Sequence, residues 1–231
     1  MAERRRALVT GGNRGIGLAV VELLAGRGYD VVLGSRDREA GVRAAASIRG
    51  AAGASAGTIE VVALDVADPH SVAALDRALG PRGVDVLVNN AAFNPRHDHD
   101  PAAIELAWQT NLLGAWRTAR AVLPGMRARG WGRIVNASTE LAIEAHLPRR
   151  GGGYDITKIA LNAMTRALAE DLAGTGILVN ACSPGWCRTD MGGPTAPRSI
   201  AQGAASLVWG VSLPDDGPSG GFFQDGHPLA W

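Results

Sequence analysis

The spacing of the hydrophobic residues switches repeatedly along the chain, and this alternation limits the fold more than any other feature. Short runs rich in Val, Ile and Leu alternate with longer stretches of helical period. This is typical of βαβ units, in which helices cover both faces of a parallel sheet. The predicted strands are 7–10, 30–34, 58–64, 84–89, 133–137 and 177–181, with a short seventh at 221–223. The predicted helices are about 15–27, 37–49, 70–79, 101–129, 153–173 and 199–210.

The chain length fits one domain. A single α/β domain commonly reaches 231 residues, and no linker, internal repeat or charged tail interrupts the pattern. The Ala/Gly-rich stretch 50–57 is interpreted as a loop. Four glycines follow predicted helices, where a residue that accepts positive φ usually ends a helix: Gly28, Gly80, Gly130 and Gly174. We therefore expect residues 1–231 to form a single Rossmann-type α/β domain, a doubly wound parallel sheet of six or seven strands with helices on both faces.

Charge and composition exclude several classes of partner. The formal net charge is +1, with 46% hydrophobic and 19% charged residues, so we expect binding to neither nucleic acid nor an anionic membrane. The arginines at 4–6 precede an apolar run too short for a signal peptide or a membrane span, which predicts a cytoplasmic protein. Cys182 and Cys187 are too few for a disulfide framework and are expected to pack in the core.

A glycine-rich turn follows the first predicted strand. Residues 10–17 read T-G-G-N-R-G-I-G, with glycine at 11, 15 and 17. Glycine permits a tight turn, close approach of phosphates to the backbone, and packing of the next helix on the sheet. The N-terminus of that helix can receive a pyrophosphate. The spacing differs from the commoner G-x-G-x-x-G, and an ordinary turn is the alternative, but its place between strand and helix favours dinucleotide binding.

Two arginines favour a phosphorylated dinucleotide. Arg36 follows the second predicted strand, where an arginine suits a 2′-phosphate and an acid suits a free ribose. Arg14 can join it through charge-assisted hydrogen bonds. The neighbouring Asp37 and the solvated state of most arginines are the counter-arguments. Asp65, after the third strand, is expected either to meet the adenine amino group or to cap a turn.

Lys158 is the only lysine beside 22 arginines, and it follows Tyr154 by four residues. Positions i and i+4 share one face of a helix, so the phenol and the ammonium point the same way. Lysine is a compact charge that can bond a sugar hydroxyl and favour a phenolate. The alternative is an ordinary surface pair. The spacing indicates that Tyr154 is an acid tuned by Lys158.

Taken in order, these motifs resemble the short-chain dehydrogenase/reductases, and within them the NADPH-dependent carbonyl reductases. The resemblance rests on segments 10–17, 64–66, 89–92, 110–111, 132–139, 154–158 and 184–191. It implies that Tyr154 protonates a carbonyl oxygen, that Lys158 holds the nicotinamide ribose and lowers the tyrosine pKa, and that Asn111 helps to hold a relay water; a helix kink or cap is the alternative for Asn111. It also implies NADP(H) contacts from Gly11, Asn13, Arg14, Gly15, Ile16, Gly17, Arg36, Asp65, Val66, Asn90, Tyr154, Lys158, Pro184, Gly185, Cys187 and Thr189.

The chain departs from this pattern at two places. Counted from Gly132, the family's catalytic serine position falls on Thr139, with Ser138 just before it. Adjacent strand residues face opposite sides, so one of the two hydroxyls is expected at the carbonyl, and we favour Thr139. Threonine keeps the donor and adds a methyl group. Segment 89–92 reads N-N-A-A, with alanine where the family usually has glycine; Asn90 remains available there.

Two segments bear on assembly and substrate. Fifteen positions separate Thr139 from Tyr154, whereas the monomeric carbonyl reductases that the chain resembles carry a long insertion there, which predicts a homodimer or homotetramer. Segment 192–199 is a short expected lid, leaving an open pocket. Trp186 and Phe93 are expected either to line the pocket for a hydrophobic carbonyl compound or to be core residues.

Other chemistry is disfavoured. The run H-D-H-D at 97–100 precedes a proline and is expected to be a solvated loop with no metal, because a metal site needs ligands from several segments. The sequence contains no Gly-x-Ser-x-Gly elbow between a predicted strand and a predicted helix, which argues against a serine hydrolase. The predicted function is NADPH-dependent reduction of a ketone, aldehyde or quinone-like carbonyl. The alternatives are a non-catalytic NADP(H)-binding regulator or scaffold, and an alcohol dehydrogenase or ketoreductase of a biosynthetic pathway.

Overall fold

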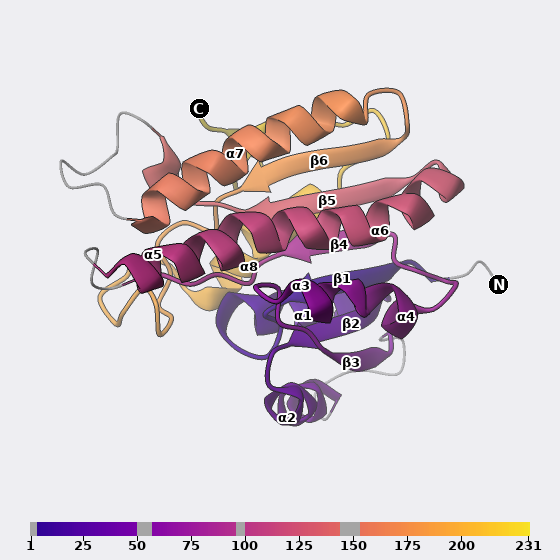
Figure 1. Cartoon of the computed structure of the whole chain (residues 1–231), viewed down its shortest axis with the longest axis horizontal. Helices are drawn as coiled ribbons and strands as arrows, with labels where there is room; N and C mark the ends of the chain where they lie inside the picture. Colours follow the sequence, from indigo (N-terminus) through magenta and orange to yellow (C-terminus); the bar gives the residue numbers. More distant parts are fainter. Residues whose placement is uncertain (1–3, 50–56, 96–99, 144–152) are drawn as a thin grey trace.

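The computed structural model describes residues 4–49, 57–95, 100–143 and 153–231. Within these ranges the strands form one sheet in the order β3-β2-β1-β4-β5-β6-β7-β8 (Figure 1). The first seven run parallel, and β8 pairs antiparallel with β7. The strands are β1 (Arg6–Thr10), β2 (Asp30–Ser35), β3 (Ile59–Ala63), β4 (Val86–Asn89), β5 (Gly132–Ala137), β6 (Ile177–Cys182), β7 (Phe222–Gln224) and β8 (His227–Pro228).

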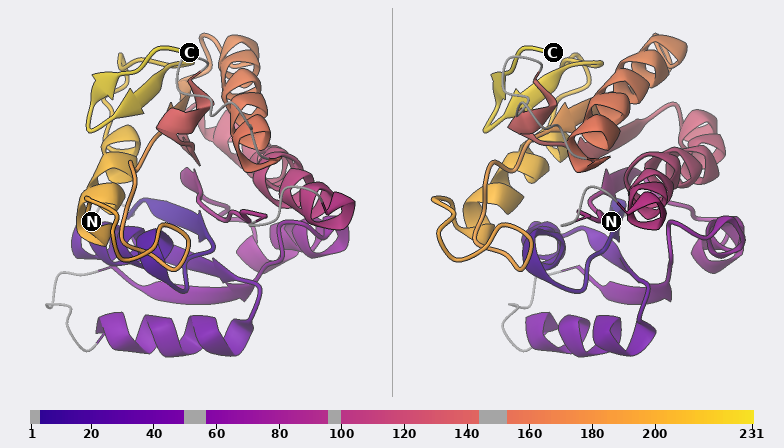
Figure 2. Two further views of the ribbon diagram at one scale, coloured as in Figure 1. Left: turned by 90° about the vertical axis from the view of Figure 1, so that its left-hand side faces the viewer. Right: turned by 60° about the vertical axis from the view of Figure 1, so that its left-hand side comes forward.

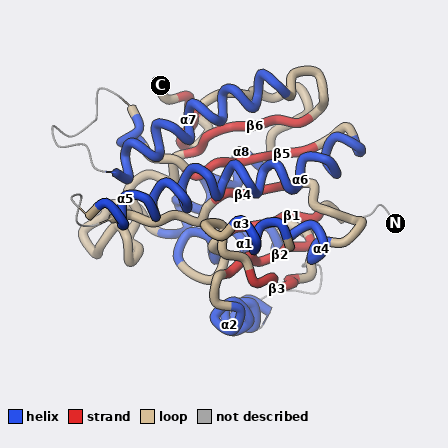
Figure 3. Tube along the Cα trace, in the orientation of Figure 1, coloured by secondary structure: helices blue, strands red, loops and turns tan. Residues whose placement is uncertain are grey.

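Helices cover both faces of the sheet. Core side chains of α1, α2 and α8 pack on one face, and those of α3, α4, α6 and α7 pack on the other. Figure 3 shows α6 and α7 on the same face of the sheet, running roughly along the strands. The helices are α1 (Gly15–Gly26), α2 (Arg38–Arg49), α3 (Pro69–Ala73), α4 (Leu75–Leu79), α5 (Pro101–Ala107), the π-helix η1 (Trp108–Gly114), α6 (Ala115–Arg129), the 3₁₀ helix η2 (Glu140–Ala142), α7 (Gly153–Asp171) and α8 (Ile200–Val211).

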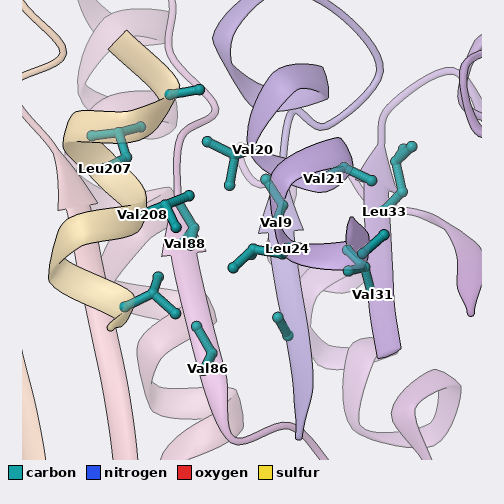
Figure 4. Close-up of a cluster of buried hydrophobic side chains, with 14 of the residues drawn as sticks. Val9, Val20, Val21, Leu24, Val31, Leu33, Val86, Val88, Leu207 and Val208 are labelled. Atoms are coloured by element: carbon teal, nitrogen blue, oxygen red, sulfur yellow. The ribbon is translucent and has the colours of Figure 1, made fainter. Parts of the chain in front are cut away.

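The apolar strands are buried on both sides, which explains their nearly continuous hydrophobic sequence. In β1, Val9 packs in the cluster beneath α1 and α8, whereas its neighbour Leu8 packs in the cluster beneath α6 and α7. Figure 4 shows the first cluster, in which Val88 lies against Val208 of α8 and Val9 lies beside Leu24 of α1. Two cores on one sheet hold the strands, and with them the site residues, in fixed register.

The doubly wound parallel sheet predicted from the sequence is confirmed, including the short strand at 221–223. The eighth strand, β8, was not predicted, because a two-residue strand ending in proline carries no period-2 signal. The predicted helix 70–79 is broken into α3 and α4 at Ala74, and the predicted helix 101–129 contains the π-helix η1. Positive φ follows the expected helix ends at Gly28, Gly80, Gly130 and Gly174.

The carboxyl ends of the parallel strands meet at one edge of the sheet. The glycine-rich turn after β1, the start of α7 and the loop after β6 all lie along this edge, which faces the viewer in the left panel of Figure 2. Open α/β sheets bind their ligands at this edge. Among the described residues, no helix combines the length and the hydropathy needed to cross a membrane.

Candidate active site

The glycine-rich turn is shaped to receive a phosphate. Gly15 has a φ of +55°, a conformation that side chains rarely adopt. At Gly17 an added Cβ would lie 2.3 Å from the carbonyl oxygen of Gly11, so only glycine fits there. No side chain caps the N-terminus of α1 at Arg14, and the first turn holds no acidic residue. Within the described residues, the first backbone N–H groups of α1 are therefore left for an anion.

Asn90 and Thr10 hold this turn in place. The Asn90 side-chain amide donates to the carbonyl oxygens of Thr10 at 3.0 Å and Gly11 at 3.2 Å. The hydroxyl of Thr10 accepts hydrogen bonds from the backbone nitrogens of Asn90 and Ala91, both at 3.0 Å. The side-chain nitrogen of Asn90 thus belongs to the turn, and a direct contact with a cofactor remains a prediction.

The two arginines expected at a 2′-phosphate differ in their surroundings. Arg36 is exposed beyond the end of β2 and forms no ion pair among the described residues. Arg14 is exposed and pairs with Asp190 at 3.0 Å. Asp37, the carboxylate that argued for an unphosphorylated cofactor, accepts a 3.0 Å hydrogen bond from the Ala40 nitrogen at the start of α2. Asp37 therefore acts as a helix cap, which weakens that counter-argument.

Asp65 caps a turn. Its carboxylate accepts a 3.0 Å hydrogen bond from the Ala67 nitrogen, and its own nitrogen donates to the Ser71 hydroxyl at 2.9 Å. The turn-capping alternative is thus what the structure shows, and the adenine contact stays a prediction. The next residue, Val66, is buried where a Cβ on Gly114 would come within 2.9 Å of its side chain. Val66 links the end of β3 to the π-helix.

Tyr154 and Lys158 lie one turn apart near the start of α7. The Lys158 ammonium is 5.6 Å from the centre of the Tyr154 ring. It donates a 2.7 Å hydrogen bond to the carbonyl oxygen of Ala137, the last residue of β5. The Lys158 side chain is only 2% exposed. An ammonium so well buried is held at one place, which an ordinary surface pair would not be.

Burial shifts both titrations. It lowers the pKa of Lys158 to about 8. Burial also raises the pKa of Tyr154 above its ordinary value of 10.0, and the Asp155 carboxylate adds to that rise. The net shift of the Tyr154 pKa is therefore upward, opposite in sign to the lowering that the resemblance implied, because burial disfavours the charged phenolate. Tyr154 keeps its proton at neutral pH, as a proton donor must.

Asn111 connects the π-helix to α7. Its side chain accepts a 2.8 Å hydrogen bond from the Phe93 nitrogen and donates at 2.8 Å to the Phe93 carbonyl oxygen. It also donates at 2.9 Å to the hydroxyl of Thr157, which in turn donates at 2.7 Å to the Tyr154 carbonyl oxygen. Asn111 is both the helix irregularity expected as the alternative and a link to Tyr154. The sequence pattern assigns no role to Thr157, although it lies inside the Tyr154–Lys158 run.

Ser138 and Thr139 have different surroundings at the end of β5. Ser138 is buried, and its hydroxyl has no hydrogen-bond partner in the described part of the chain. Thr139 is half-buried and extended at the N-cap of η2, where its hydroxyl accepts a 3.3 Å hydrogen bond from the Leu141 nitrogen. An accepting hydroxyl retains its own hydrogen to donate. The unpartnered Ser138 hydroxyl keeps its hydrogen too, so the greater exposure of Thr139 is what favours it as a donor to a ligand.

The loop after β6 folds back on itself. Its first turn is closed by the Ser183 hydroxyl, which accepts a 3.0 Å hydrogen bond from the Gly185 nitrogen. The Cys187 thiol donates at 3.2 Å to the carbonyl oxygen of Pro184. Thr189 accepts a 3.0 Å hydrogen bond from the Gly192 nitrogen. The sequence-predicted contacts of Pro184, Gly185, Cys187 and Thr189 with a cofactor remain predictions, whereas burial of both cysteines in the core is confirmed.

The expected pocket walls differ in exposure. Trp186 is 51% exposed, and its indole nitrogen donates at 2.8 Å to the Gly192 carbonyl oxygen, so it is not a core residue. Phe93 is half-buried with its backbone held by Asn111. The described residues contain no cluster of His, Cys, Asp and Glu that could hold a metal. Residues 97–99 of the histidine-rich run lie outside the described part of the chain, and Asp100 caps α5.

Comparisons with known proteins agree with this geometry. The family described as short chain dehydrogenase matches residues 5–199. Carbonyl reductase [NADPH] 1 of Sus scrofa is 35% identical, over 98% of this chain and 94% of the relative. That alignment spans 280 residues, more than this chain contains, so the relative carries insertions that the chain lacks.

Solved structures give the same result. A 3-oxoacyl-[acyl-carrier protein] reductase from Brucella melitensis has a TM-score of 0.85 at 28% identity, covering 99% of this chain and 92% of the other. A metagenomic short-chain oxidoreductase in complex with NADP has a TM-score of 0.79 at 27% identity, covering 98% of each chain. From the sequence match and from the site at the carboxyl edge of its sheet, the chain belongs to the short-chain dehydrogenase family.

Proposed function

We propose that this protein is an NADPH-dependent oxidoreductase that reduces a ketone, aldehyde or quinone-like carbonyl, with Tyr154 as the general acid. One observation carries the proposal: α7 holds the Tyr154 phenol and the buried Lys158 side chain one turn apart, and η1 fixes that turn through Asn111. Chemistry of this kind depends on orientation of the reacting groups more than on their strength. The structure supports this by holding the three side chains on packed helices.

The turn after β1 fits a dinucleotide. Only glycine fits at position 17, and α1 offers uncapped N–H groups to a pyrophosphate. Arg14 and Arg36 are exposed beside it and would hold a 2′-phosphate, which agrees with the NADPH and NADP in the names of related proteins. Bound there, the nicotinamide would supply the hydride. The Lys158 ammonium would hold its ribose.

The chain's own residues would handle the proton. Tyr154 keeps its O–H because burial raises its pKa, and it would give that proton to the carbonyl oxygen. The Thr139 hydroxyl, which accepts from the Leu141 nitrogen, would donate a second hydrogen bond to the same oxygen. Asn111 would hold the start of α7 at the distance that this transfer needs.

The decisive experiment follows the absorbance of the reduced cofactor. Purified protein is incubated with NADPH or NADH and a panel containing aromatic ketones, aldehydes, quinones and a 3-oxoacyl thioester. We expect turnover with at least one of the carbonyl compounds and a preference for NADPH. Binding of NADPH without turnover of any compound, or with oxidation of alcohols only, would instead favour a regulator or an alcohol dehydrogenase.

The 3-oxoacyl thioester tests a second candidate function. The structural neighbour from Brucella melitensis is named a 3-oxoacyl-[acyl-carrier protein] reductase and covers 99% of this chain. Trp186, in the segment between β6 and α8, is 51% exposed, so a substrate bound against it would stay accessible to a carrier protein. Turnover of the thioester well above that of free ketones would assign the protein to this class.

We also propose that two copies associate through α5–α6 and α7. Trp116 and Ile156 are exposed on these neighbouring helices, 45% and 48% respectively, and Leu113, three residues before Trp116, is 36% exposed. Large apolar side chains exposed on adjacent helices are typical of an interface. Light scattering after gel filtration is expected to give the mass of a dimer or tetramer, and Trp116→Glu is expected to lower it. A wild-type monomer would refute the proposal.

A further inference from the structure

An ion pair joins two distant parts of the chain above the glycine-rich turn. The guanidinium of Arg14 donates a 3.0 Å hydrogen bond to the carboxylate of Asp190, 176 residues further along. The loop of Asp190 lies directly over the turn, because a Cβ on Gly15 would come within 3.8 Å of the Thr189 methyl carbon. The pair therefore spans the place where we propose that the cofactor phosphates bind.

Arg14 can pair with two anions: the carboxylate of Asp190, which it contacts in the structure, and the 2′-phosphate that we propose binds beside Arg36. The proposed 2′-phosphate site is at Arg36, beyond the end of β2, which neighbours β1 on one side. Asp190 comes from the loop after β6, which is reached from β1 on the other side, across β4 and β5. The two loops thus start on opposite sides of β1, and the Asp190 loop reaches back over the turn. An Arg14 guanidinium that turns toward a phosphate at Arg36 gives up contact with Asp190, so the two anions compete for it.

We propose that Asp190 sets the preference between NADPH and NADH by competing with the 2′-phosphate for Arg14. The inference rests on the proposed function and names a specificity-determining residue of the same site. NADH lacks this phosphate and has no need to withdraw Arg14 from Asp190. The carboxylate thus weakens NADPH binding more than NADH binding and narrows the preference for NADPH.

The exposure of the pair limits the size of the effect. The side chains of Arg14 and Asp190 are 76% and 83% exposed. Ion pairs so well solvated contribute little, which corresponds to about a twofold to fivefold change in affinity. Salt screens such pairs, so the effect of Asp190 should decline as ionic strength rises.

The test is a double-mutant cycle on cofactor binding. Dissociation constants for NADPH and NADH are measured by calorimetry for the wild type, Asp190→Asn, Arg14→Gln and the double variant. Asp171→Asn is the matched control, because it removes the same charge at the exposed end of α7, at the opposite edge of the sheet. Asp190→Ser serves as a second replacement in case the amide disturbs the loop.

We expect Asp190→Asn to tighten NADPH binding about twofold to fivefold and to leave NADH binding unchanged. The gain should vanish in the Arg14→Gln background, and Asp171→Asn should change neither constant. Equal gains for both cofactors, or a gain that persists without Arg14, would show that Asp190 acts through net charge and would overturn the inference. No gain in either Asp190 variant would overturn it too. If the wild type binds neither cofactor, both the proposed function and the inference about Asp190 fail.

Discussion

The Lys158 ammonium donates a 2.7 Å hydrogen bond to the carbonyl oxygen of Ala137, where β5 ends, and lies 5.6 Å from the centre of the Tyr154 ring. This contact ties α7 to the sheet at the level where the proposed chemistry occurs. Arginines supply every other basic side chain except histidine in this chain, yet a guanidinium is too large and rigid for the same role. The place of the single lysine is explained by this contact.

The pH dependence of reduction should report Lys158. Its pKa is lowered to about 8 by burial, whereas Tyr154 stays protonated well above that pH. We expect kcat/KM for carbonyl reduction to be constant below about pH 8 and to fall above it, as Lys158 loses its charge. Lys158→Arg, which cannot lose its charge, should have lower activity and no such fall. A wild-type profile that is flat to pH 10 would contradict this assignment.

The same shift predicts how stability depends on pH. The folded pKa of Lys158, about 8, lies below its ordinary value of 10.5, so the unfolded chain binds this proton more tightly. The cost of the buried charge is present in full below pH 8 and disappears as the pH rises toward 10.5. Relative to Lys158→Met, the wild type should therefore gain free energy of unfolding across this window. Urea denaturation at several pH values measures it, and a decrease would refute the sign.

The threonine at the family's serine position can be tested with two substitutions. Thr139→Ser keeps the hydroxyl that accepts from the Leu141 nitrogen, and Thr139→Val keeps the shape without a hydroxyl. If Thr139 donates to the carbonyl oxygen, Thr139→Val should lower kcat by about 10²-fold or more, as loss of an oxyanion donor does. Thr139→Ser should remain active. Loss of activity in Ser138→Ala, but not in Thr139→Val, would transfer the role to Ser138.

Helix α1 offers a matched pair of glycine substitutions, one at the glycine-rich turn and one at the other end of the helix. At Gly17 an added Cβ would lie 2.3 Å from the Gly11 carbonyl oxygen, whereas at Gly26 nothing lies within 4 Å. Gly17→Ala should displace the turn and weaken NADPH binding by at least about tenfold, a loss of about 1.4 kcal/mol. Gly26→Ala should keep binding and raise stability by up to about 1 kcal/mol. Calorimetry measures binding and thermal unfolding measures stability. Equal NADPH binding by both variants would contradict the proposal that the glycine-rich turn binds the cofactor.

The sequence predicted the sheet and the core because apolar period and helix-ending glycines are local signals. It predicted the chemical side chains through the motifs that hold them. It did not predict the π-helix at Asn111. It also missed the role of Thr157, because that role depends on a hydrogen bond between residues 46 positions apart. The rise in the Tyr154 pKa could not be predicted from the sequence for a similar reason, since burial is set by packing and not by the spacing to Lys158. The Arg14–Asp190 pair joins two loops that no sequence pattern connects.

The central claim is that Tyr154 donates the proton, and it is tested most directly by comparing Tyr154→Phe with Tyr29→Phe. Tyr29, the other tyrosine of the chain, precedes β2 and lies away from the site. NADPH-dependent carbonyl reduction and the NADPH dissociation constant are measured for both variants. We predict that Tyr154→Phe loses about 10² to 10⁴-fold in kcat while still binding NADPH, and that Tyr29→Phe behaves as the wild type. Retention of most of the activity by Tyr154→Phe would contradict the account.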